Sequence, residues 1–216
     1  RTHQIKRTMA TMNVQLTEIE SLPEEIAAPP EITTPRANLD VSGIVAGIQE
    51  AKRPLILVGA GARKAADRVR AFAERSGVPV VSSVRGLGII PSDHPLSFGW
   101  IGHTGMPWAN WALDEADLVL TLGSRLDVRQ TGTVVEEFTD KEILQVDVDP
   151  VELEHVRLAG VQPIRADVED VLDQLLGGER PEDTQVWSEW RKAIDDARTR
   201  LPLQDRGHAE GVRPDE

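Results

Sequence analysis

Five short apolar runs, separated by segments with helical spacing of apolar residues, constrain the fold of this chain most. The runs cover residues 54–58, 78–81, 118–122, 142–146 and, more weakly, 161–164. Strands that are buried on both faces have unbroken apolar runs, and they belong to parallel sheets that helices cover on both sides. Parallel neighbours need right-handed crossovers, which the intervening helices supply. The sequence therefore predicts an α/β fold: a Rossmann-like, doubly wound three-layer sandwich with a mainly parallel sheet of five or six strands.

Helical spacing predicts five helices. The first begins after Asp40, and the other four cover residues 62–76, 108–116, 168–176 and a last segment near 184–200. We expect Asp40 to cap the first helix and Gly177-Gly178 to end the helix over 168–176.

The patterned region lies between two segments without a periodic apolar face. Residues 21–38 contain Pro23, Pro29, Pro30 and Pro35, and proline favours extended backbone. We therefore predict three parts: a tail and Pro-rich linker over 1–38, an α/β domain over 39–200 and a C-terminal linker over 201–216.

Composition excludes several classes of function. The chain has 216 residues with 24 Lys+Arg and 36 Asp+Glu, so its formal net charge is −12, which disfavours binding to nucleic acid or anionic lipid. It has no cysteine, which excludes disulfides, thiolate nucleophiles and Cys-ligated zinc. No segment approaches the ~20 apolar residues that span a bilayer. We expect no membrane partner and a cytoplasmic location.

Motifs for several chemistries are missing from the sequence. The five histidines are dispersed without the spacing of metal ligands, so no metal site is expected. The sequence has no G-x-S-x-G nucleophile elbow and no G-x-x-x-x-G-K-[ST] phosphate loop. No catalytic residue is therefore predicted.

Residues suited to nucleotide binding follow each apolar run. In open parallel sheets, ligands bind beyond the carboxyl ends of the strands. The segments there are 59–61, 82–86, 123–129, 147–149 and 166–168. Glycine lets backbone approach a ligand, a helix N-terminus offers N–H groups to an anion, and arginine offers a planar fork to a diphosphate. These segments predict a nucleotide-diphosphate site in which aspartates accept hydrogen bonds from ribose or a ring N–H.

The glycines and arginines also have a purely structural interpretation. Gly59 and Gly61 would suit a tight turn, and Arg125 and Arg129 would suit a solvated surface cluster with Asp127. The sequence leaves both interpretations open.

The aspartates have the same ambiguity. Asp147 and Asp149 precede a proline, as in many turns and helix starts, and Asp167 would suit the N-cap of the helix over 168–176. The hypothesis of a nucleotide site therefore depends on all five segments meeting at one edge of the sheet.

A nicotinamide-dinucleotide site is the first rival. Its fingerprint needs G-x-G-x-x-G after the first strand and an acidic residue at the end of the second. Residues 59–64 read Gly-Ala-Gly-Ala-Arg-Lys without the third glycine, and the second run ends in Ser82-Ser83. An NADP-dependent oxidoreductase domain stays open as an alternative because Arg85 could bind a 2′-phosphate.

Residues 123–132 read Gly-Ser-Arg-Leu-Asp-Val-Arg-Gln-Thr-Gly. This segment resembles the G-x-R-x-D-x-R-x-T-G signature of the central domain of thiamine-diphosphate-dependent enzymes, most closely the acetolactate synthase type. Other segments that resemble this family occur in the family's order, at 59–61, 94–96, 102–110, 145–150 and 165–168. The resemblance covers residues 39–200, and residues 13–20 resemble the end of the family's preceding pyrimidine-binding domain.

The resemblance implies a set of cofactor-binding residues. In this family the central domain binds FAD in acetolactate synthases, ADP in oxalyl-CoA decarboxylase and nothing in some decarboxylases. The resemblance places the diphosphate and ribose near Gly59, Ala60, Gly61, Arg125 and Arg129. It places the flavin and adenine near Ser82, Ser83, Gly102, His103, Asp127, Asp147, Asp167 and Val168. Gly123 and Ser124, within the signature, complete the candidates.

The sequence departs from the family pattern at two places. Acetolactate synthases usually have two adjacent aspartates in the signature, whereas Val128 follows Asp127 here. Their G-M-H-G segment corresponds to residues 102–105, which read Gly-His-Thr-Gly, so the histidine is displaced by one position. Both departures concern the flavin-ring end of the site.

The family holds thiamine diphosphate and Mg²⁺ with a G-D-G…N-N motif in one further domain and activates the cofactor with a glutamate in another. This sequence contains no Gly-Asp-Gly and no Asn-Asn. We therefore expect neither group to bind and no carboligase or decarboxylase activity from this chain alone. The expected partners are a nucleotide and the missing catalytic domains or a partner chain.

Three functions follow from the sequence. The first is an FAD- or ADP-binding central domain, the second a structural module between catalytic domains without a ligand, and the third the NADP-dependent oxidoreductase domain. Trp100, Trp108 and Trp111 flank the loop over 102–110, where they would report a bound flavin or serve only as packing residues.

Overall fold

A computed structural model of the protein describes residues 39–178 and 186–201. The chain divides into two units, Arg1–Glu31 and Ile32–Glu216, and all described residues belong to the second. The predicted tail and linker over 1–38 lie outside the described residues, as does the C-terminal linker apart from Leu201.

A parallel sheet of six strands forms the centre of the fold, in the order β3-β2-β1-β4-β5-β6. The strands are β1 (Pro54–Val58), β2 (Val80–Ser82), β3 (Ser97–Trp100), β4 (Leu118–Leu122), β5 (Glu142–Asp147) and β6 (Val161–Arg165). The apolar runs of β1 and β4 are buried along their whole length, as expected for central strands with helices on both faces. The α/β prediction is confirmed.

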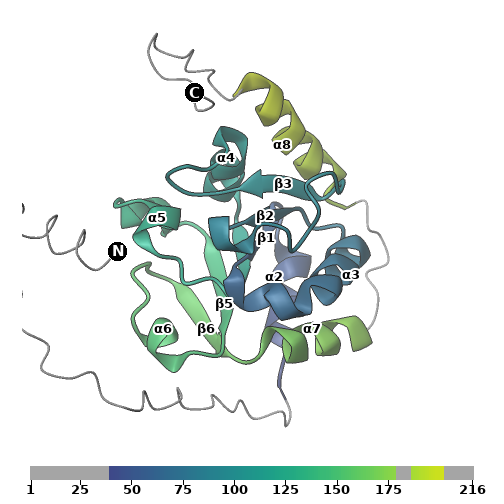
Figure 1. The fold of residues 1–216 in the computed structure, drawn as a ribbon, viewed down its shortest axis with the longest axis vertical. Coiled ribbons are helices and arrows are strands. Elements are labelled where there is room, and N and C mark those ends of the chain that lie inside the picture. Colours follow the sequence, from purple (N-terminus) through teal and green to yellow (C-terminus); the bar gives the residue numbers. More distant parts are fainter. Residues whose placement is uncertain (1–38, 179–185, 202–216) are drawn as a thin grey trace, which may run out of the picture. The chain divides into compact units, whose positions relative to one another are not determined.

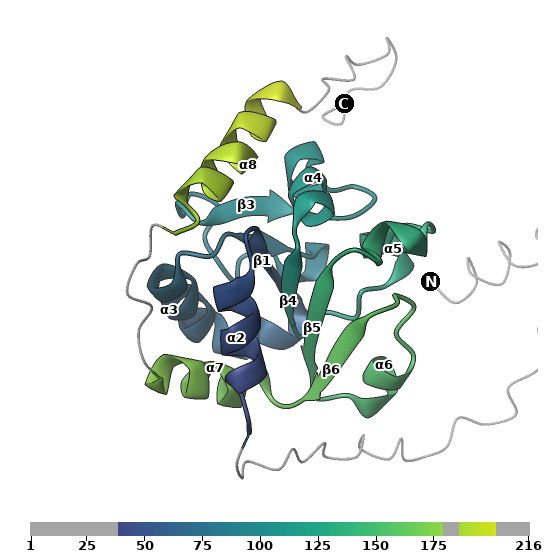
Figure 2. The same ribbon diagram turned by 180° about the vertical axis from the view of Figure 1, so that it is seen from behind.

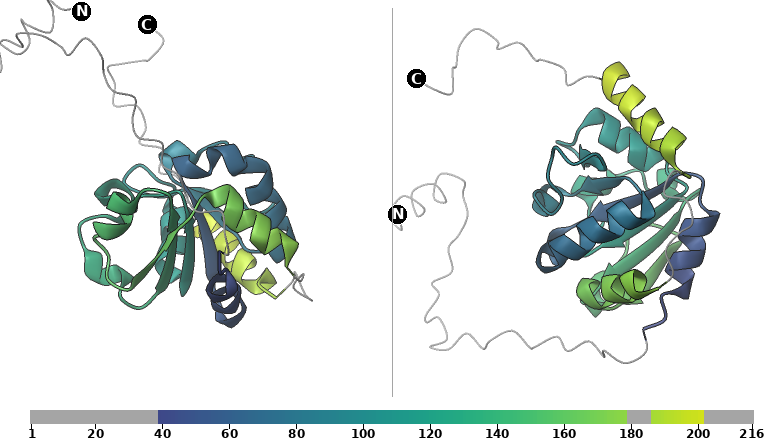
Figure 3. Two further views of the ribbon diagram at one scale, coloured as in Figure 1. Left: turned by 90° about the horizontal axis from the view of Figure 1, so that it is seen from below. Right: turned by 90° about the vertical axis from the view of Figure 1, so that its right-hand side faces the viewer.

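Helices cover both faces of the sheet. Figures 1 and 2, which view the molecule from opposite sides, show α3 (Ala66–Ser76) and α7 (Val168–Gly177) on one face. They show α2 (Ser42–Glu50), α4 (Pro107–Glu115) and α8 (Ser188–Arg200) on the other face. The side views in Figure 3 show the resulting three layers. Shorter helical turns in the connections are η1 (Ala60–Ala65), η2 (Val84–Gly86), α5 (Val128–Thr131), η3 (Val135–Phe138) and α6 (Pro150–Glu154).

Three details differ from the sequence prediction. Strand β3 lies in a segment for which no strand was expected, because Ser97–Trp100 is a partly exposed edge strand rather than an apolar run. The predicted helix over 62–76 is divided into the tighter turn η1 and the helix α3. The N-cap of α2 is Val41 rather than Asp40.

Asp40 nevertheless contributes at the start of α2. Its Oδ1 accepts a hydrogen bond from the Ser42 N–H at 2.9 Å. Hydrogen bonds from the Ser42 side chain and backbone hold the pKa of the Asp40 carboxyl below its ordinary value.

Two tryptophans attach α8 to the sheet. The buried Trp187 and Trp190 donate their indole N–H groups to the carbonyl oxygens of Ala51 and Pro54, at 3.1 and 3.0 Å. The apolar body of each ring fills the core while its polar N–H is satisfied.

Among the described residues, no helix is both long and apolar enough to cross a membrane.

Candidate functional site

A cleft of about 1760 Å³ opens at the carboxyl edge of the sheet, where the loops after β1, β2, β3, β4 and β5 all contribute to its walls. Most of the candidate residues line it: Gly59, Ala60, Gly61, Ser83, Gly102, His103, Gly123, Ser124, Arg125, Asp127, Arg129 and Asp147. Ser82, Asp167 and Val168 do not line it. The structure therefore brings together candidates from five separate segments of the chain.

Three glycines bring the loops after β1 and β4 into direct backbone contact. A Cβ atom on Gly59 would lie 2.1 Å from the carbonyl oxygen of Gly123, and one on Gly123 would lie 2.5 Å from the Cα of Gly61. Gly123 also has a φ of +60°, which favours glycine. The N–H groups of Gly59 and Gly61 donate to the carbonyls of Leu122 and Gly123. Contact between the two loops thus suffices to explain these glycines.

The loop after β3 is fastened at two points. The Asn110 side chain accepts from the Gly102 N–H at 2.7 Å and donates to the Gly102 carbonyl at 3.0 Å. The His103 N–H donates to the Arg129 carbonyl at 2.8 Å. A Cβ atom on Gly102 would lie 2.4 Å from that same carbonyl oxygen, so the close approach of the two loops requires glycine.

The signature segment turns sharply at Leu126. This buried residue has a φ of +53° and is the one described non-glycine residue with positive φ; such backbone is uncommon for side chains other than Asn or Asp. Asp127 follows as the N-cap of α5, and its Oδ1 accepts from the N–H groups of Arg129 and Gln130 at 2.9 and 3.2 Å. The turn separates the Arg125 side chain, before it, from the short helix that carries Arg129.

Side-chain hydrogen bonds connect Ser124 and Gln130, which line the cleft, to Gln145 in β5. The Ser124 hydroxyl donates to the Gln130 side-chain oxygen at 2.6 Å, and the Gln145 side-chain N–H donates to the Ser124 carbonyl at 3.2 Å. Ser124 and Gln145 are both buried. These bonds connect the loop after β4 to α5 and to the neighbouring strand β5.

Three arginines line the cleft, and they have different partners. Arg125 Nε lies 3.1 Å from Glu152 Oε1, so the partner of Arg125 is Glu152 and not Asp127. Within the described residues, the side chains of Arg85 and Arg129 have no hydrogen bond or ion pair. These two guanidinium groups are available to an anionic ligand.

Carboxylates line the cleft at the end of β5. Asp147 Oδ1 accepts from the Asp149 N–H at 3.0 Å, and Asp149 Oδ1 accepts from the Val151 N–H at 2.9 Å as the N-cap of α6. Each of the two uses one oxygen to hold the backbone and keeps the other for a donor. Arginines from the loops after β2 and β4 thus share the cleft with carboxylates from the loop after β5, and Asp114 and Asp127 add further carboxylates to its walls.

The three candidates outside the cleft have structural positions. Ser82 is buried in β2, and its carbonyl accepts from the Ile101 N–H at 2.9 Å. Asp167 is the N-cap of α7 and accepts from the Glu169 N–H at 2.8 Å. Val168 is buried in the core. The structural interpretation of Asp167 that the sequence left open is the arrangement observed.

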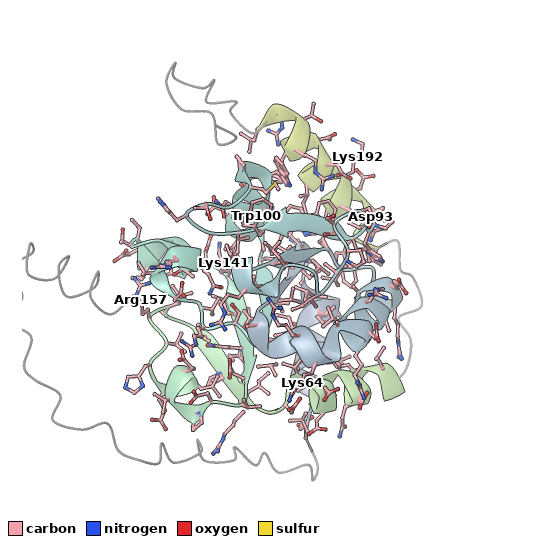
Figure 4. All side chains as sticks on the ribbon, in the orientation of Figure 1. Lys64, Asp93, Trp100, Lys141, Arg157 and Lys192 are labelled. Carbon is pink, nitrogen blue, oxygen red and sulfur yellow. The ribbon has the colours of Figure 1, made fainter. Side chains whose placement is uncertain are left out.

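The three tryptophans near the loop after β3 have different roles. Trp111 lines the cleft, and its ring lies 5.8 Å from that of Trp190 in α8. Trp108 is buried and donates to the Phe98 carbonyl at 2.9 Å. Trp100, labelled beside β3 in Figure 4, donates to the Thr104 carbonyl at 2.9 Å. Trp111 is thus the one of the three that a ligand in the cleft would contact.

The sequence interpretation missed several residues of the cleft. Glu152 in α6, Gln130 in α5 and Thr133 after it all line its walls. Arg157, labelled near α5 in Figure 4, does not line the cleft, but it donates a hydrogen bond of 3.3 Å to the carbonyl of Gly132, which does. The position of Glu152 three residues after the helix cap Asp149 is the sequence signal that would have drawn attention to it.

No group of three or more His, Cys, Asp or Glu residues that could hold a metal ion occurs in the part of the chain that the structure describes. The side chains that line the cleft include both arginines and carboxylates.

The family of the chain follows from comparison with known proteins. A family model described as "Thiamine pyrophosphate enzyme, central domain" matches residues 41–175. The chain belongs to this central-domain family. The signature at 123–132 and the glycines at 59 and 61 lie within the matched region.

Relatives of this central domain include acetolactate synthases. It is 34% identical over 197 residues to "Acetolactate synthase 1, chloroplastic" of Zea mays, which covers 90% of this chain and 30% of the relative. It is 35% identical over 187 residues to "Acetolactate synthase isozyme 1 large subunit" of Escherichia coli, covering 86% and 32%. It is 37% identical over 175 residues to "Acetolactate synthase large subunit" of Corynebacterium glutamicum, covering 79% and 28%. The chain thus spans about a third of the length of these relatives.

Proposed function

We propose that this central domain binds a nucleotide that contains a diphosphate, ADP or the ADP half of FAD, in the cleft at the carboxyl edge of the sheet. The observation that carries the proposal is the pair Arg85 and Arg129, which line the cleft with no partner in the described structure. Guanidinium groups without a structural role in a concave site suit a phosphate, which they bind with charge-assisted hydrogen bonds.

The residues of the cleft fit such a nucleotide. The arginines would hold the diphosphate, and the free oxygens of Asp147 and Asp149 would accept hydrogen bonds from ribose hydroxyls or an adenine amino group. Trp111 and the exposed Val128 add apolar surface to the walls. A bound nucleotide would supply a negatively charged partner for Arg85 and Arg129, which have none among the described residues. The residues Ser82, Asp167 and Val168 contribute by holding β2 and α7, without lining the cleft.

The relatives' names describe the synthesis of acetolactate. We propose that this domain takes part in such an activity only within a larger protein. The chain carries neither of the motifs that hold thiamine diphosphate and Mg²⁺ in this family. We propose that the domain contributes nucleotide binding and the connection between catalytic domains, and that it forms no acetolactate from pyruvate alone.

Calorimetric titration of the full chain with ADP, FAD and NADPH tests the proposal. We expect ADP and FAD to bind and NADPH to bind more weakly, because the fingerprint for the nicotinamide dinucleotides is incomplete. FAD should also lower tryptophan emission, since Trp111 lines the cleft.

Two outcomes would contradict the proposal in different ways. Binding of NADPH alone would favour the oxidoreductase alternative. The absence of heat and of any change in emission with all three nucleotides would favour a structural module without a ligand.

A further inference from the structure

We infer that Glu152 is a competing counter-ion for Arg125, so that it lowers the affinity of the cleft for anionic ligands and makes that affinity depend on ligand charge. The inference rests on the proposed function, because it concerns how the same cleft receives a diphosphate. It assigns a role to a residue that the signature motif does not include.

The geometry of the pair supports competition. Arg125 Nε lies 3.1 Å from Glu152 Oε1, and both residues line the cleft. A carboxylate oxygen and a phosphate oxygen are acceptors of the same kind for a guanidinium group. Glu152 therefore occupies a donor that a phosphate would use.

The exposed fractions of the two side chains show that Glu152 is the more firmly positioned partner of the ion pair. The Arg125 side chain is 62% exposed, whereas that of Glu152 is 28% exposed. Glu152 lies in the first turn of α6, which Asp149 caps with a hydrogen bond of 2.9 Å. The capped helix α6 thus fixes the position of the Glu152 carboxylate in the wall of the cleft, and the more exposed Arg125 side chain contacts it.

The charge of the walls increases the effect. The cleft is lined by Arg85, Arg125 and Arg129 against Asp114, Asp127, Asp147, Asp149 and Glu152, a formal balance of three positive and five negative charges. An incoming phosphate therefore meets net negative walls, and its attraction to Arg125 is offset by the nearest carboxylate. Charges at the mouth of a cleft interact with a ligand through partly screened fields.

An alternative role for Glu152 makes the opposite prediction. If the carboxylate only oriented Arg125 toward the ligand, its loss would weaken binding because the arginine would lose its fixed position. Competition predicts that its loss strengthens binding, and the sign of the change distinguishes the two roles.

The test is calorimetric titration of the full chain and of Glu152→Gln with adenosine, AMP and ADP. The variant keeps the size and hydrogen-bonding capacity of the side chain and removes its charge. We expect ADP to bind about two- to five-fold more tightly to Glu152→Gln, the range of a partly exposed ion pair. The gain should be smaller for AMP and absent for adenosine, and it should shrink as salt is added.

Two further variants locate the effect. Glu154→Gln makes the same change of charge in the same helix at an exposed residue that does not line the cleft, and it should leave the affinity for ADP within two-fold. In an Arg125→Ala background the gain from Glu152→Gln should fall, because no guanidinium remains to be released. The melting temperature of each variant confirms that it is folded.

The outcomes separate this inference from the proposed function. If the unsubstituted chain binds no ADP, both are overturned. If it binds ADP and Glu152→Gln binds ADP equally well or more weakly, the inference alone is overturned. An equal gain for adenosine and ADP would also overturn it, since a change independent of ligand charge is not electrostatic.

Discussion

The centre and the flanks of the cleft differ in what determines their residues. At the centre, the loops after β1 and β4 touch through Gly59, Gly61 and Gly123, and any Cβ atom there would strike the backbone of the opposite loop. At the flanks, Arg85 and Arg129 line the cleft without a side-chain partner in the described structure. The glycines are explained by packing within the protein, whereas the arginines are not. Side chains without a structural role are therefore the stronger indication of a ligand.

The largest effect is expected at the centre. Gly59 has an extended backbone with a φ of −112°, which any residue can adopt, so Gly59→Ala tests the steric contact alone. Its Cβ would lie 2.1 Å from the Gly123 carbonyl oxygen, and separating the loops should lower the free energy of unfolding by at least about 3 kcal/mol. Urea denaturation measures this loss.

Gly43→Ala is the matched control. Gly43 lies inside α2, and a Cβ atom there has no neighbour within 4 Å. Alanine is the better helix former, so this variant should be more stable by about 0.5–1 kcal/mol. Similar effects of the two variants would show that the loops do not depend on glycine.

The next effect is expected at the flank. Arg129→Ala should reduce the affinity for ADP by about 1.5–3 kcal/mol, which is the range for a hydrogen bond to a charged group. Because its side chain has no partner in the described residues, the free energy of unfolding should stay within about 0.5 kcal/mol. Calorimetry and urea denaturation give the two quantities.

Arg53→Ala provides the control for Arg129→Ala. It removes the same charge from the opposite edge of the sheet, directly before β1. An equal loss of ADP affinity in both variants would indicate attraction through net charge rather than contact in the cleft.

The smallest effect is expected at Asp167, which the family resemblance places near the cofactor but which does not line the cleft in the structure. Asp167→Ala should lower the free energy of unfolding by about 1 kcal/mol, because Asp167 caps α7. The affinity for ADP should not change, since Asp167 does not line the cleft. Weaker ADP binding at unchanged melting temperature would instead place the start of α7 in the binding site.

Much of the fold was predictable because the central strands are short apolar runs. The runs at 54–58 and 118–122 coincide with β1 and β4. Strand β3 was not predictable from the same signal, because an edge strand is buried less and Ser97–Trp100 contains Ser97 and Gly99. The boundary between η1 and α3 also has no clear signal, since both turns place alanines toward the core.

The site was predictable in its location but not in its pairings. The rule that ligands bind beyond the carboxyl ends of parallel strands placed Gly59, Arg125 and Asp147 at one edge, and the family resemblance added Gly102. The partner of Arg125 was not predictable, because Glu152 comes from a different connection and meets it only through the fold. Local spacing instead pointed to Asp127, which the structure uses as a helix cap.

The hydrogen bond from His103 to the Arg129 carbonyl joins the loop after β3 to the segment that carries an unpartnered arginine. Asn110 also holds Gly102 on the same loop, so hydrogen bonds within the protein itself fix this side of the cleft. When a binding site is already ordered, binding of a ligand costs little conformational entropy of the protein. Encounter by diffusion, rather than rearrangement of these loops, should then govern how fast the domain is loaded.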